Sequence, residues 1–365
     1  MSRVKSHPMR GGNAFKLGVF GANADGCLSI TNHADRWMAD WDDVVAAAQM
    51  ADRAGLDFFL PLARWKGFGG DTNARHISYE TFTFAAALAG LTEQIALFST
   101  VHTLIVPPVY AAKALATVDH ASHGRAGLNI VCGWNQPEFD MFGLTKPDQV
   151  YDQGKEWFEI LTRTLEGGAP FDYKGDYFDL KGVSGAPGSV QAPHPVTLSA
   201  AFSPPGRDFA ASACDCIFTT FNTHEDARET IADFRARVEK AGSNAGVFAP
   251  VHVVCRPTTQ EAEDYYTAYA VTETDNAAVD QHMAMKKSMS GSHDPKAYDL
   301  YRKRFAGGAG TYPLIGTPEQ IADEMIALHD LGFGGLALSF VNPKYELPYF
   351  LDRVLPLLKK AGIRT

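Results

Sequence analysis

One asparagine in the middle of an apolar, strand-like run raises the first chemical question. Asn129 lies within ASHGRAGLNIVCGWNQPEF, residues 121–139. A buried amide without hydrogen-bond partners costs kilocalories, so this side chain needs a structural network or a ligand. Alternate residues of a strand share a face, which would align Asn129 with Gly127 and Val131. Asn129 is therefore the first candidate for a functional residue.

Further candidates follow the other strands that the sequence predicts. In a barrel, chemistry takes place at the carboxyl ends of the strands. Residues at such positions are mostly polar and uncharged; they are Ala63, Arg64 and Lys66 after the second strand, Ser99, Thr100, His102 and Thr103 at the third, Asn129, Cys132, Trp134 and Glu138 at the fourth, and Ser199 and Ser203 at the fifth. If strands three and four are neighbours, Thr100 and Asn129 lie side by side. This pair is either a structural hydrogen bond or part of a ligand site.

These candidates do not have the composition of a metal site. A metal-dependent hydrolase or aldolase needs a cluster of His and carboxylate ligands at strand ends. The only short His spacing is His120 with His123, at the end of a predicted helix. Cys214 and Cys216 have no second Cys or His pair, so we interpret them as core residues. A mouth lined with hydroxyls, amides, Gly and aromatics is typical of a bound organic cofactor, and we expect no metal.

The elements that must position these residues alternate between short apolar runs and longer amphipathic runs. The apolar runs predict eight strands, at 15–20, 57–62, 95–101, 126–131, 196–200, 216–221, 249–255 and 335–340. The amphipathic runs predict helices, several of which open on Asp or Thr and close on Gly. Eight such repeats predict an α/β fold, a (β/α)8 TIM barrel with insertions. The runner-up is a doubly wound open sheet, but GVFGANADG lacks the G-x-G-x-x-G spacing.

The domain organisation follows from the same pattern. We expect an N-terminal extension over residues 1–14 and a single barrel domain over 15–365, with insertions near 171–195 and 272–311. The first insertion reads as a hairpin with a Pro/Gly-rich loop. The second is polar and ends in RFAGGAGTY, whose glycines would suit a lid hinge. Such insertions either cover the active site or are surface loops without a role.

Charge and cysteine content exclude several classes of protein. The chain has 33 basic and 42 acidic residues, a net charge of −9 and no basic run, which argues against nucleic-acid binding. Five scattered cysteines predict reduced thiols. The N-terminus has no apolar leader, and no run approaches the roughly 18 apolar residues of a membrane span. We therefore expect a cytoplasmic protein that binds neither membrane nor nucleic acid.

With these residues in view, the sequence resembles the bacterial luciferase-like flavin-dependent monooxygenases, and within them the pyrimidine monooxygenase and alkanesulfonate monooxygenase group. The matches run in order along most of the chain: FKLGVF, ARWKGFGGDT, TLIVPPVYAAKALATVDHASHGRAGLNIVCGWNQPEF, YDQGKEWFEIL, FDYKGDYFDL and GGAGTYPLIGTPEQIADEM. The string G-R-x-x-x-N-x-V-x-G-W, with Pro and Glu downstream, is the most specific of them. The resemblance implies a (β/α)8 barrel with insertions, in agreement with the independent strand count.

The resemblance also implies a flavin site. FMN, in the form of FMNH2, would be bound at positions that here are Ala63, Arg64, Asn129, Glu138, Val150, Tyr151 and Ser203. Ala63 and Arg64 would reach the isoalloxazine edge, while Tyr151 and Ser203 would hold the phosphate with help from backbone N–H groups at a helix start. The related pyrimidine oxygenase has Lys in place of Arg64 and Arg in place of Val150. One phosphate-side charge is therefore lost here, and we expect weak FMN binding.

Thr100 and Asn129 match the pair that holds O2 beside N5 of reduced flavin in the family, so the resemblance implies that they are catalytic. An uncharged donor pair in a dry pocket can orient O2 without offering a proton early, which favours a flavin-N5 peroxide over C4a chemistry. The implied reaction is oxygenation of a small organic substrate by O2 and FMNH2. Nothing in the sequence resembles a nicotinamide site, so a separate NAD(P)H-dependent flavin reductase is the implied partner.

The sequence leaves the substrate open. Candidate substrate-pocket residues, on position alone, are Trp65, Phe68, His76, Trp134 and Phe340, each of which could equally be packing. The 21–39 loop has no charged cluster, which favours a neutral N-heterocycle, sulfone or haloaromatic, unless Arg64, Lys66 and Arg75 bind an anion. Alternatives within the superfamily are hydride transfer with the deazaflavin F420 and a barrel that binds flavin without catalysis. We expect a homodimer or homotetramer.

Overall fold

Eight parallel strands close into a barrel in the computed structural model, which describes residues 7–133, 135–200, 202–287 and 295–365. Around the barrel the order is β1 (Lys16–Phe20), β2 (Phe58–Leu60), β3 (Ala96–His102), β4 (Ala126–Val131), β7 (Val196–Ala200), β8 (Cys216–Phe218), β9 (Gly246–Cys255) and β11 (Gly335–Ser339). Pairing of β11 with β1 completes the ring. These are the eight strands that the sequence predicts, so the (β/α)8 class is confirmed.

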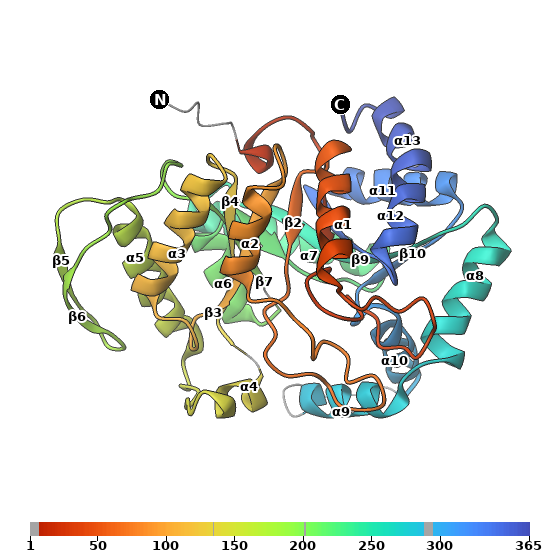
Figure 1. Cartoon of the computed structure of the whole chain (residues 1–365), viewed down its shortest axis with the longest axis horizontal. Coiled ribbons are helices and arrows are strands. Elements are labelled where there is room, and N and C mark those ends of the chain that lie inside the picture. The colour runs from red at the N-terminus through yellow and green to blue at the C-terminus, as the bar shows by residue number, and fades with distance from the viewer. Residues whose placement is uncertain (1–6, 134, 201, 288–294) are drawn as a thin grey trace.

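Helices surround the barrel (Figure 1). They are α1 (Trp41–Arg53), α2 (Thr81–Ala89), α3 (Pro108–Ala121), α4 (Gln136–Met141), α5 (Val150–Leu165), α6 (Pro204–Ala213), α7 (His224–Ala241), α8 (Thr259–Thr267), α9 (Asn276–Lys287), α10 (Pro295–Gly308), α11 (Pro318–Leu331), α12 (Pro343–Arg353) and α13 (Leu355–Lys360). Several boundaries have local causes: α7 is capped by the Thr223 side chain and ends at Gly242, which has φ +65°. Among the described residues, no helix has the length and apolarity needed to cross a membrane.

Two separate cores hold the barrel. The inner one fills the lumen with Phe58, Leu60, Phe98, Leu198, Phe218, Phe248 and their small neighbours. The outer one lies between the strands and the helices and is much larger. Large rings fit inside the lumen because neighbouring strands carry glycine. A Cβ on Gly18 would lie 2.3 Å from the Phe58 ring, and one on Gly127 would lie 2.7 Å from the Phe98 ring.

The floor of the barrel is closed by residues from the first and last described segments of the chain. His7 Nε2 bonds the Ala126 carbonyl at 3.1 Å. Lys16 lies 3.8 Å from the carboxylate of Asp57, and Arg364 donates to the same carboxylate at 2.6 Å. With the floor sealed, the opposite face, where the strands end, is left for a site.

An additional parallel strand, β10 (Tyr312–Gly316), pairs with the second half of β9. The sequence did not predict β10. Its position follows from the lengths of its neighbours: β9 has ten residues, whereas β8 pairs only with its first three, from Gly246 to Phe248. The remaining edge of β9, from Val251 to Cys255, is then available to β10.

Two helices, α9 and α10, occupy the polar stretch in which the sequence predicted no element. Their apolar residues pack on the loops that follow β1 and β2, in a cluster formed by Ile30, Phe68, Ala74, Ala278, Val279, Met283, Phe305 and Ala306. The Asp275 carboxylate, at the start of α9, accepts hydrogen bonds from the Thr72 N–H and hydroxyl at 2.7 and 2.8 Å. These helices thus cover the barrel mouth at β2. The other insertion contains the antiparallel hairpin β5 (Phe171–Lys174) and β6 (Asp179–Val183).

Candidate active site

Thr100 and Asn129 meet at the mouth of the barrel. They are register partners on β3 and β4, and Asn129 Nδ2 lies 3.2 Å from Thr100 Oγ1. The Thr100 hydroxyl donates its proton to the Pro61 carbonyl at 2.6 Å, so its oxygen can only accept from Asn129. The amide is thereby oriented with Nδ2 toward Thr100. Asn129 Oδ1 is buried and has no hydrogen-bond partner within the described part of the chain.

This geometry corrects one expectation from the sequence, namely that the pair offers two donors. The single proton of Thr100 is already committed to Pro61. Only Asn129 presents free hydrogen-bonding groups, an acceptor and its second amide hydrogen. Thr100 therefore positions the amide, and Asn129 is the member of the pair whose oxygen has no partner among the described residues.

Arg64 and Glu138 form a buried ion pair beside this amide. Arg64 follows β2, and its Nη1 lies 3.2 Å from Oε1 of Glu138, which is on α4. The Trp65 N–H donates to the same carboxylate oxygen at 3.0 Å. Burial lowers the pKa of Arg64, although Glu138 opposes that effect. The pair fixes the Ala63–Arg64 segment against α4.

His102 adds a neutral imidazole to this pair. Its Nδ1 lies 3.5 Å from Glu138 Oε2, and both side chains are buried. Burial, with a smaller effect of Arg64, lowers the pKa of His102 to about 3, so the ring is uncharged near neutral pH. His102 is the last residue of β3 and shares the inward face with Thr100. From the sequence we expect His102 at a strand end, but no pattern there predicts a role for it.

The phosphate candidates meet at the start of α6. Ser203 is its N-cap, and the Ser203 side chain accepts from the Gly206 N–H at 3.3 Å. Tyr151, in the first turn of α5, has its hydroxyl 3.4 Å from Ser203 Oγ. A Cβ on Gly206 would lie 2.5 Å from that phenol oxygen, so glycine is what lets the Tyr151 hydroxyl approach the start of α6. Val150 is half-buried against the outer core and brings no polar group.

The substrate candidates are dispersed. Phe68 is buried, with the guanidinium carbons of Arg64 and Arg75 at 5.1 and 5.0 Å from its ring centre. Arg75 bonds the Cys27 and Leu28 carbonyls, and burial, with help from Arg64, lowers its pKa to about 9. The Trp65 ring is 40% exposed. Trp134 lies outside the described residues.

Two of the substrate candidates do not reach the mouth. The His76 side chain is exposed on the surface. Phe340 is part of the outer core and packs on Phe350 of α12, with ring centres 5.9 Å apart. Strand alternation explains this, since Ala337 belongs to the lumen core and Leu338 to the outer one. The expectation that Phe340 lines a substrate pocket is therefore wrong.

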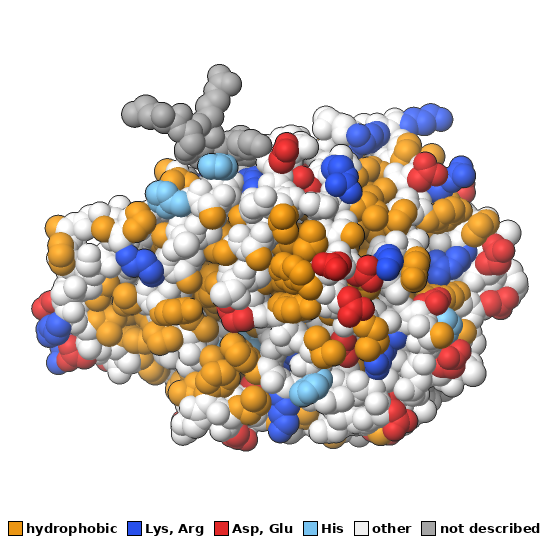
Figure 2. Space-filling model, viewed as in Figure 1, with side chains coloured by type: hydrophobic (Ala, Val, Ile, Leu, Met, Phe, Trp, Pro, Cys, Tyr) orange, Lys and Arg blue, Asp and Glu red, His pale blue; other side chains and the backbone are white. Residues whose placement is uncertain are grey.

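Hydrophobic side chains gather around α4 on the face shown in Figure 2. Trp65 packs edge-on against Phe142, with ring centres 5.1 Å apart, and Met141 and Phe142 are 56% and 42% exposed. Trp65 follows Arg64 in the chain, and Met141 and Phe142 lie within one helical turn of Glu138. They form an apolar rim beside the mouth.

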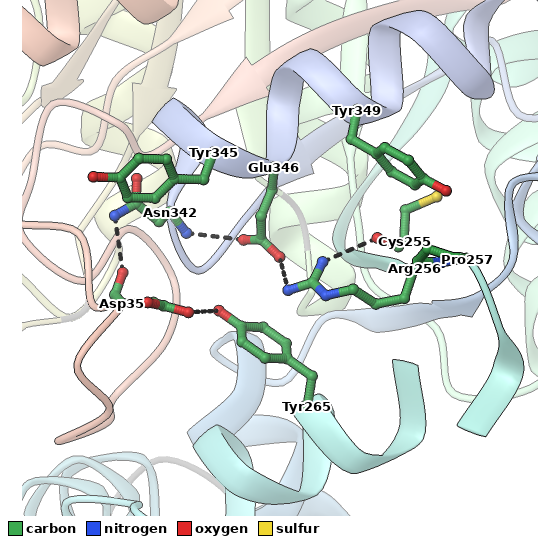
Figure 3. Close-up of a pocket in the computed structure, with 9 residues that line it drawn as sticks. All are labelled: Asp35, Cys255, Arg256, Pro257, Tyr265, Asn342, Tyr345, Glu346 and Tyr349. Atoms are coloured by element: carbon green, nitrogen blue, oxygen red, sulfur yellow. Dashed lines mark hydrogen bonds and ion pairs between the residues drawn. The ribbon is translucent and has the colours of Figure 1, made fainter. Parts of the chain in front are cut away.

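A cavity of about 310 Å³ lies apart from this site, between α8, α12 and the segment before α1 (Figure 3). Its charged groups are paired with their neighbours. Arg256 bonds Glu346 at 2.9 Å, and the Tyr265 hydroxyl donates to Asp35 at 3.2 Å. Glu346 also accepts from the Asn342 N–H. Arg256, Glu346 and Asp35 thus already have protein partners, whereas Asn129 Oδ1 has none among the described residues.

The donor set suits an organic anion and an uncharged ring. No group of three or more His, Cys, Asp or Glu side chains within the described ranges could hold a metal ion. The buried orphan acceptor of Asn129 and the neighbouring hydroxyls of Ser203 and Tyr151 are groups that a flavin nucleotide would bind. The residues present therefore fit FMN.

Comparison with known proteins agrees with this fit. The profile of a family described as luciferase-like monooxygenase matches residues 16–334. The pyrimidine monooxygenase RutA of Cronobacter turicensis is 30% identical over 357 residues, which cover 94% of this chain and 92% of that protein. Riboflavin lyase, solved with modified FMN and riboflavin, has a TM-score of 0.85 at 24% identity over 96% and 92% of the two chains. DmoA from Hyphomicrobium sulfonivorans has a TM-score of 0.85 at 20% identity, over 96% of this chain and 89% of that one.

Proposed function

The chain belongs to the luciferase-like monooxygenase family and is a flavin-dependent monooxygenase; from this premise we propose that it oxygenates a small organic substrate with O2 and FMNH2. The reduced flavin is supplied by a separate NAD(P)H-dependent reductase. The segment GVFGANADG lacks the G-x-G-x-x-G spacing of a dinucleotide-binding loop. We therefore assign NAD(P)H oxidation to a separate reductase.

The observation that carries this proposal is the buried, unpartnered Oδ1 of Asn129. A buried acceptor without a donor costs about 1–3 kcal/mol, so the site is incomplete without a ligand N–H or O–H. Reduced flavin has an N–H at N5, whereas oxidised flavin has only a lone pair there. Because Thr100 holds Nδ2, Oδ1 is the atom that Asn129 leaves open to such a donor. This arrangement supports selection of the reduced form.

The phosphate end of FMN would be held by Ser203 and Tyr151. Both hydroxyls lie at the N-terminus of α6, where the helix dipole favours an anion. Pro204 and Pro205 have no N–H, and the Gly206 N–H is bonded to Ser203, so the two side-chain hydroxyls are the donors at this end. Val150, the first residue of α5, brings no charge to this end of the site. The proposal therefore includes weak flavin binding, which suits a cofactor that arrives and leaves in each cycle.

When bound, FMNH2 supplies the two electrons that reduce one oxygen atom of O2 to water while the other enters the substrate. The chain positions these reactants and excludes water. Asn129 offers an acceptor and an amide hydrogen at the point where polar groups are needed, and the lumen beneath is filled by Phe98 and Phe218. The helices α9 and α10 cover the mouth through their contacts with Phe68 and Thr72.

The substrate that we propose is uncharged: a neutral N-heterocycle, a sulfone or a haloaromatic. Arg64 forms an ion pair with Glu138, and Arg75 donates hydrogen bonds to two backbone carbonyls. These contacts disfavour the binding of an anionic substrate by either arginine. The relative in Cronobacter turicensis is named a pyrimidine monooxygenase, and this name supports an N-heterocycle as the substrate class.

A single-turnover experiment tests the proposal. Anaerobic protein with photoreduced FMN is mixed with ¹⁸O2 and a panel of candidate compounds, and product is analysed by mass spectrometry. One ¹⁸O atom in a product supports the proposal. Reduction of a substrate by F420H2 without any need for O2 would instead establish the hydride-transfer alternative.

A further inference from the structure

A second polar group, His252, faces the barrel mouth from the side opposite Asn129. It lies on β9, two positions beyond Pro250 and four beyond Phe248, which belongs to the lumen core. Alternation along the strand therefore turns His252 toward the lumen. In the order of the barrel, β9 is the fourth strand from β3 in either direction, and β11 is the fourth from β4. A molecule bound in the mouth would lie between these two sides.

The tautomer of His252 is fixed by its neighbour Thr311. The Thr311 hydroxyl donates its one proton to the Gly308 carbonyl at 2.7 Å. Its oxygen also lies 2.9 Å from His252 Nδ1, and with the proton committed it can only accept there. Nδ1 must therefore carry the imidazole proton, and Nε2 is left as a lone-pair acceptor.

His252 Nε2 has no hydrogen-bond partner in the described ranges, and the residue is only 3% exposed. Its ring stacks on Tyr266, with centres 5.7 Å apart and planes at 25°. Burial, together with nearby Arg304, lowers the pKa of His252 to about 3, so the imidazole stays neutral near pH 7. An acceptor that is buried, neutral and unpaired is suited to a donor brought by a ligand.

Ser339 lies beside this acceptor. It is the register partner of His252 on the adjacent strand β11, and it is 2% exposed. A serine hydroxyl can both donate and accept a hydrogen bond. An imidazole acceptor and a neighbouring hydroxyl together match a ligand edge on which an N–H stands next to a carbonyl.

We propose that His252 and Ser339 determine substrate specificity by binding the N–H and the adjacent C=O of a lactam, imide or urea edge. The inference rests on the proposed oxygenase function and narrows its substrate class. Among the three classes named above it selects N-heterocycles that carry a ring N–H. Sulfones and haloaromatics without such a group would leave Nε2 unpaired, and the enzyme would discriminate against them.

The tautomer can be tested without any activity. Long-range ¹H–¹⁵N spectra of protein labelled at histidine report which imidazole nitrogen carries the proton, and His252→Gln identifies the signal. We expect a neutral ring protonated at Nδ1. Thr311→Val should disturb this tautomer, whereas Thr311→Ser keeps the accepting oxygen and should preserve it. A ring protonated at Nε2 in the wild-type protein would overturn the proposal.

Specificity is tested by anaerobic equilibrium dialysis in the presence of photoreduced FMN. The probes are uracil, hydantoin and 2-pyridone, each beside its N-methylated derivative. The wild-type protein should bind at least one N–H compound about tenfold or more tightly than its methylated partner, because methylation leaves a buried acceptor unpaired. His252→Phe keeps the ring that stacks on Tyr266 and should abolish the difference, while His252→Gln, which can still accept, should restore part of it.

The matched control is His7→Phe, which alters a buried histidine at the barrel floor and should leave the discrimination unchanged. Equal binding of every pair, or no binding of any probe, would overturn the inference. FMNH2 binding is measured in the same cells. If FMNH2 binds and no pair is discriminated, only the inference fails; if FMNH2 does not bind, the proposed function fails and the inference with it.

Discussion

The hydrogen bond from Asn129 Nδ2 to Thr100 Oγ1, at 3.2 Å, has a direction set by a third group, the Pro61 carbonyl that takes the threonine proton. The consequence is an amide that cannot flip without losing a bond. Its free oxygen then becomes a fixed acceptor at the mouth of the barrel. The chemistry of the site follows from this fixed orientation.

Thr100→Val tests the positioning role directly. Valine has nearly the same shape but cannot accept from the amide, so Asn129 becomes free to rotate. Product formed per FMNH2 oxidised should fall by about tenfold, the cost of losing one oriented hydrogen bond, and hydrogen peroxide should rise in its place. Thr100→Ser keeps the hydroxyl and should retain most of the yield. An unchanged yield in Thr100→Val would show that the pair is structural.

Ser203 offers a test of the phosphate site with its own stability control. Ser203→Ala should weaken FMN binding about tenfold, because it removes a hydroxyl bonded to a charged group. Ser203→Asp retains a good helix N-cap but opposes the phosphate, so it should weaken FMN binding further at nearly wild-type stability. Riboflavin, which lacks the phosphate, should bind all three proteins alike. Parallel losses for riboflavin and FMN would contradict the assignment.

The free energy of unfolding should fall in mild acid because of His7. Burial first, and then Arg10, lowers the pKa of His7 from 6.5 to about 3. The Met9 N–H donates to Nδ1 and the Ala126 carbonyl faces Nε2, so the folded state keeps the ring neutral. The unfolded chain binds the proton instead. This contribution is therefore complete above about pH 6.5 and is lost as the pH falls toward 3.

The expected loss is about 1.4 kcal/mol per pH unit for such a histidine within that range. Urea unfolding at pH 7 and pH 5 measures it. His7→Gln should show a smaller difference between the two values than the wild-type protein does. His76→Gln, at an exposed position, should keep the wild-type difference. Identical pH dependence in His7→Gln and the wild type would rule out the assignment.

Gly127 should be essential for the packing beneath Asn129. A Cβ there would lie 2.7 Å from the Phe98 ring, so Gly127→Ala should lower the free energy of unfolding by about 1–3 kcal/mol. Gly168 has no heavy atom within 4 Å of the corresponding position, so Gly168→Ala should be close to neutral. Urea unfolding of the two variants compares them. Equal stabilities would mean that the lumen tolerates an added methyl group.

The barrel could be predicted from the sequence because its strands are apolar runs of regular spacing. The prediction failed where the pattern was weak. β10 is a short strand that exists because β9 extends beyond β8, a relation between elements that no local pattern carries. The helices α9 and α10 are largely polar. Their few apolar residues form a buried cluster with Phe68, a contact that the local sequence does not indicate.

The candidate site was predicted in a similar way. Asn129 was recognisable because it is polar within an apolar strand, and the spacing of β3 and β4 placed Thr100 beside it. The same signal marks His252 in APVHVVC, but the lone histidine was not singled out. Its importance depends on Thr311 and Gly308, which are more than fifty residues away along the chain. The orientations of Asn129 and His252 depend on hydrogen bonds from the Thr100 and Thr311 hydroxyls to backbone carbonyls, and only the three-dimensional structure shows these bonds.

Anaerobic titration with FMNH2 and with oxidised FMN, followed by fluorescence, is the most direct test of the central claim that Asn129 selects reduced flavin. The wild-type protein should bind FMNH2 about tenfold or more tightly than FMN, and Asn129→Leu should lose that preference while remaining folded. Equal affinity of the wild-type protein for the two forms, or binding of F420 in place of FMNH2, would contradict it.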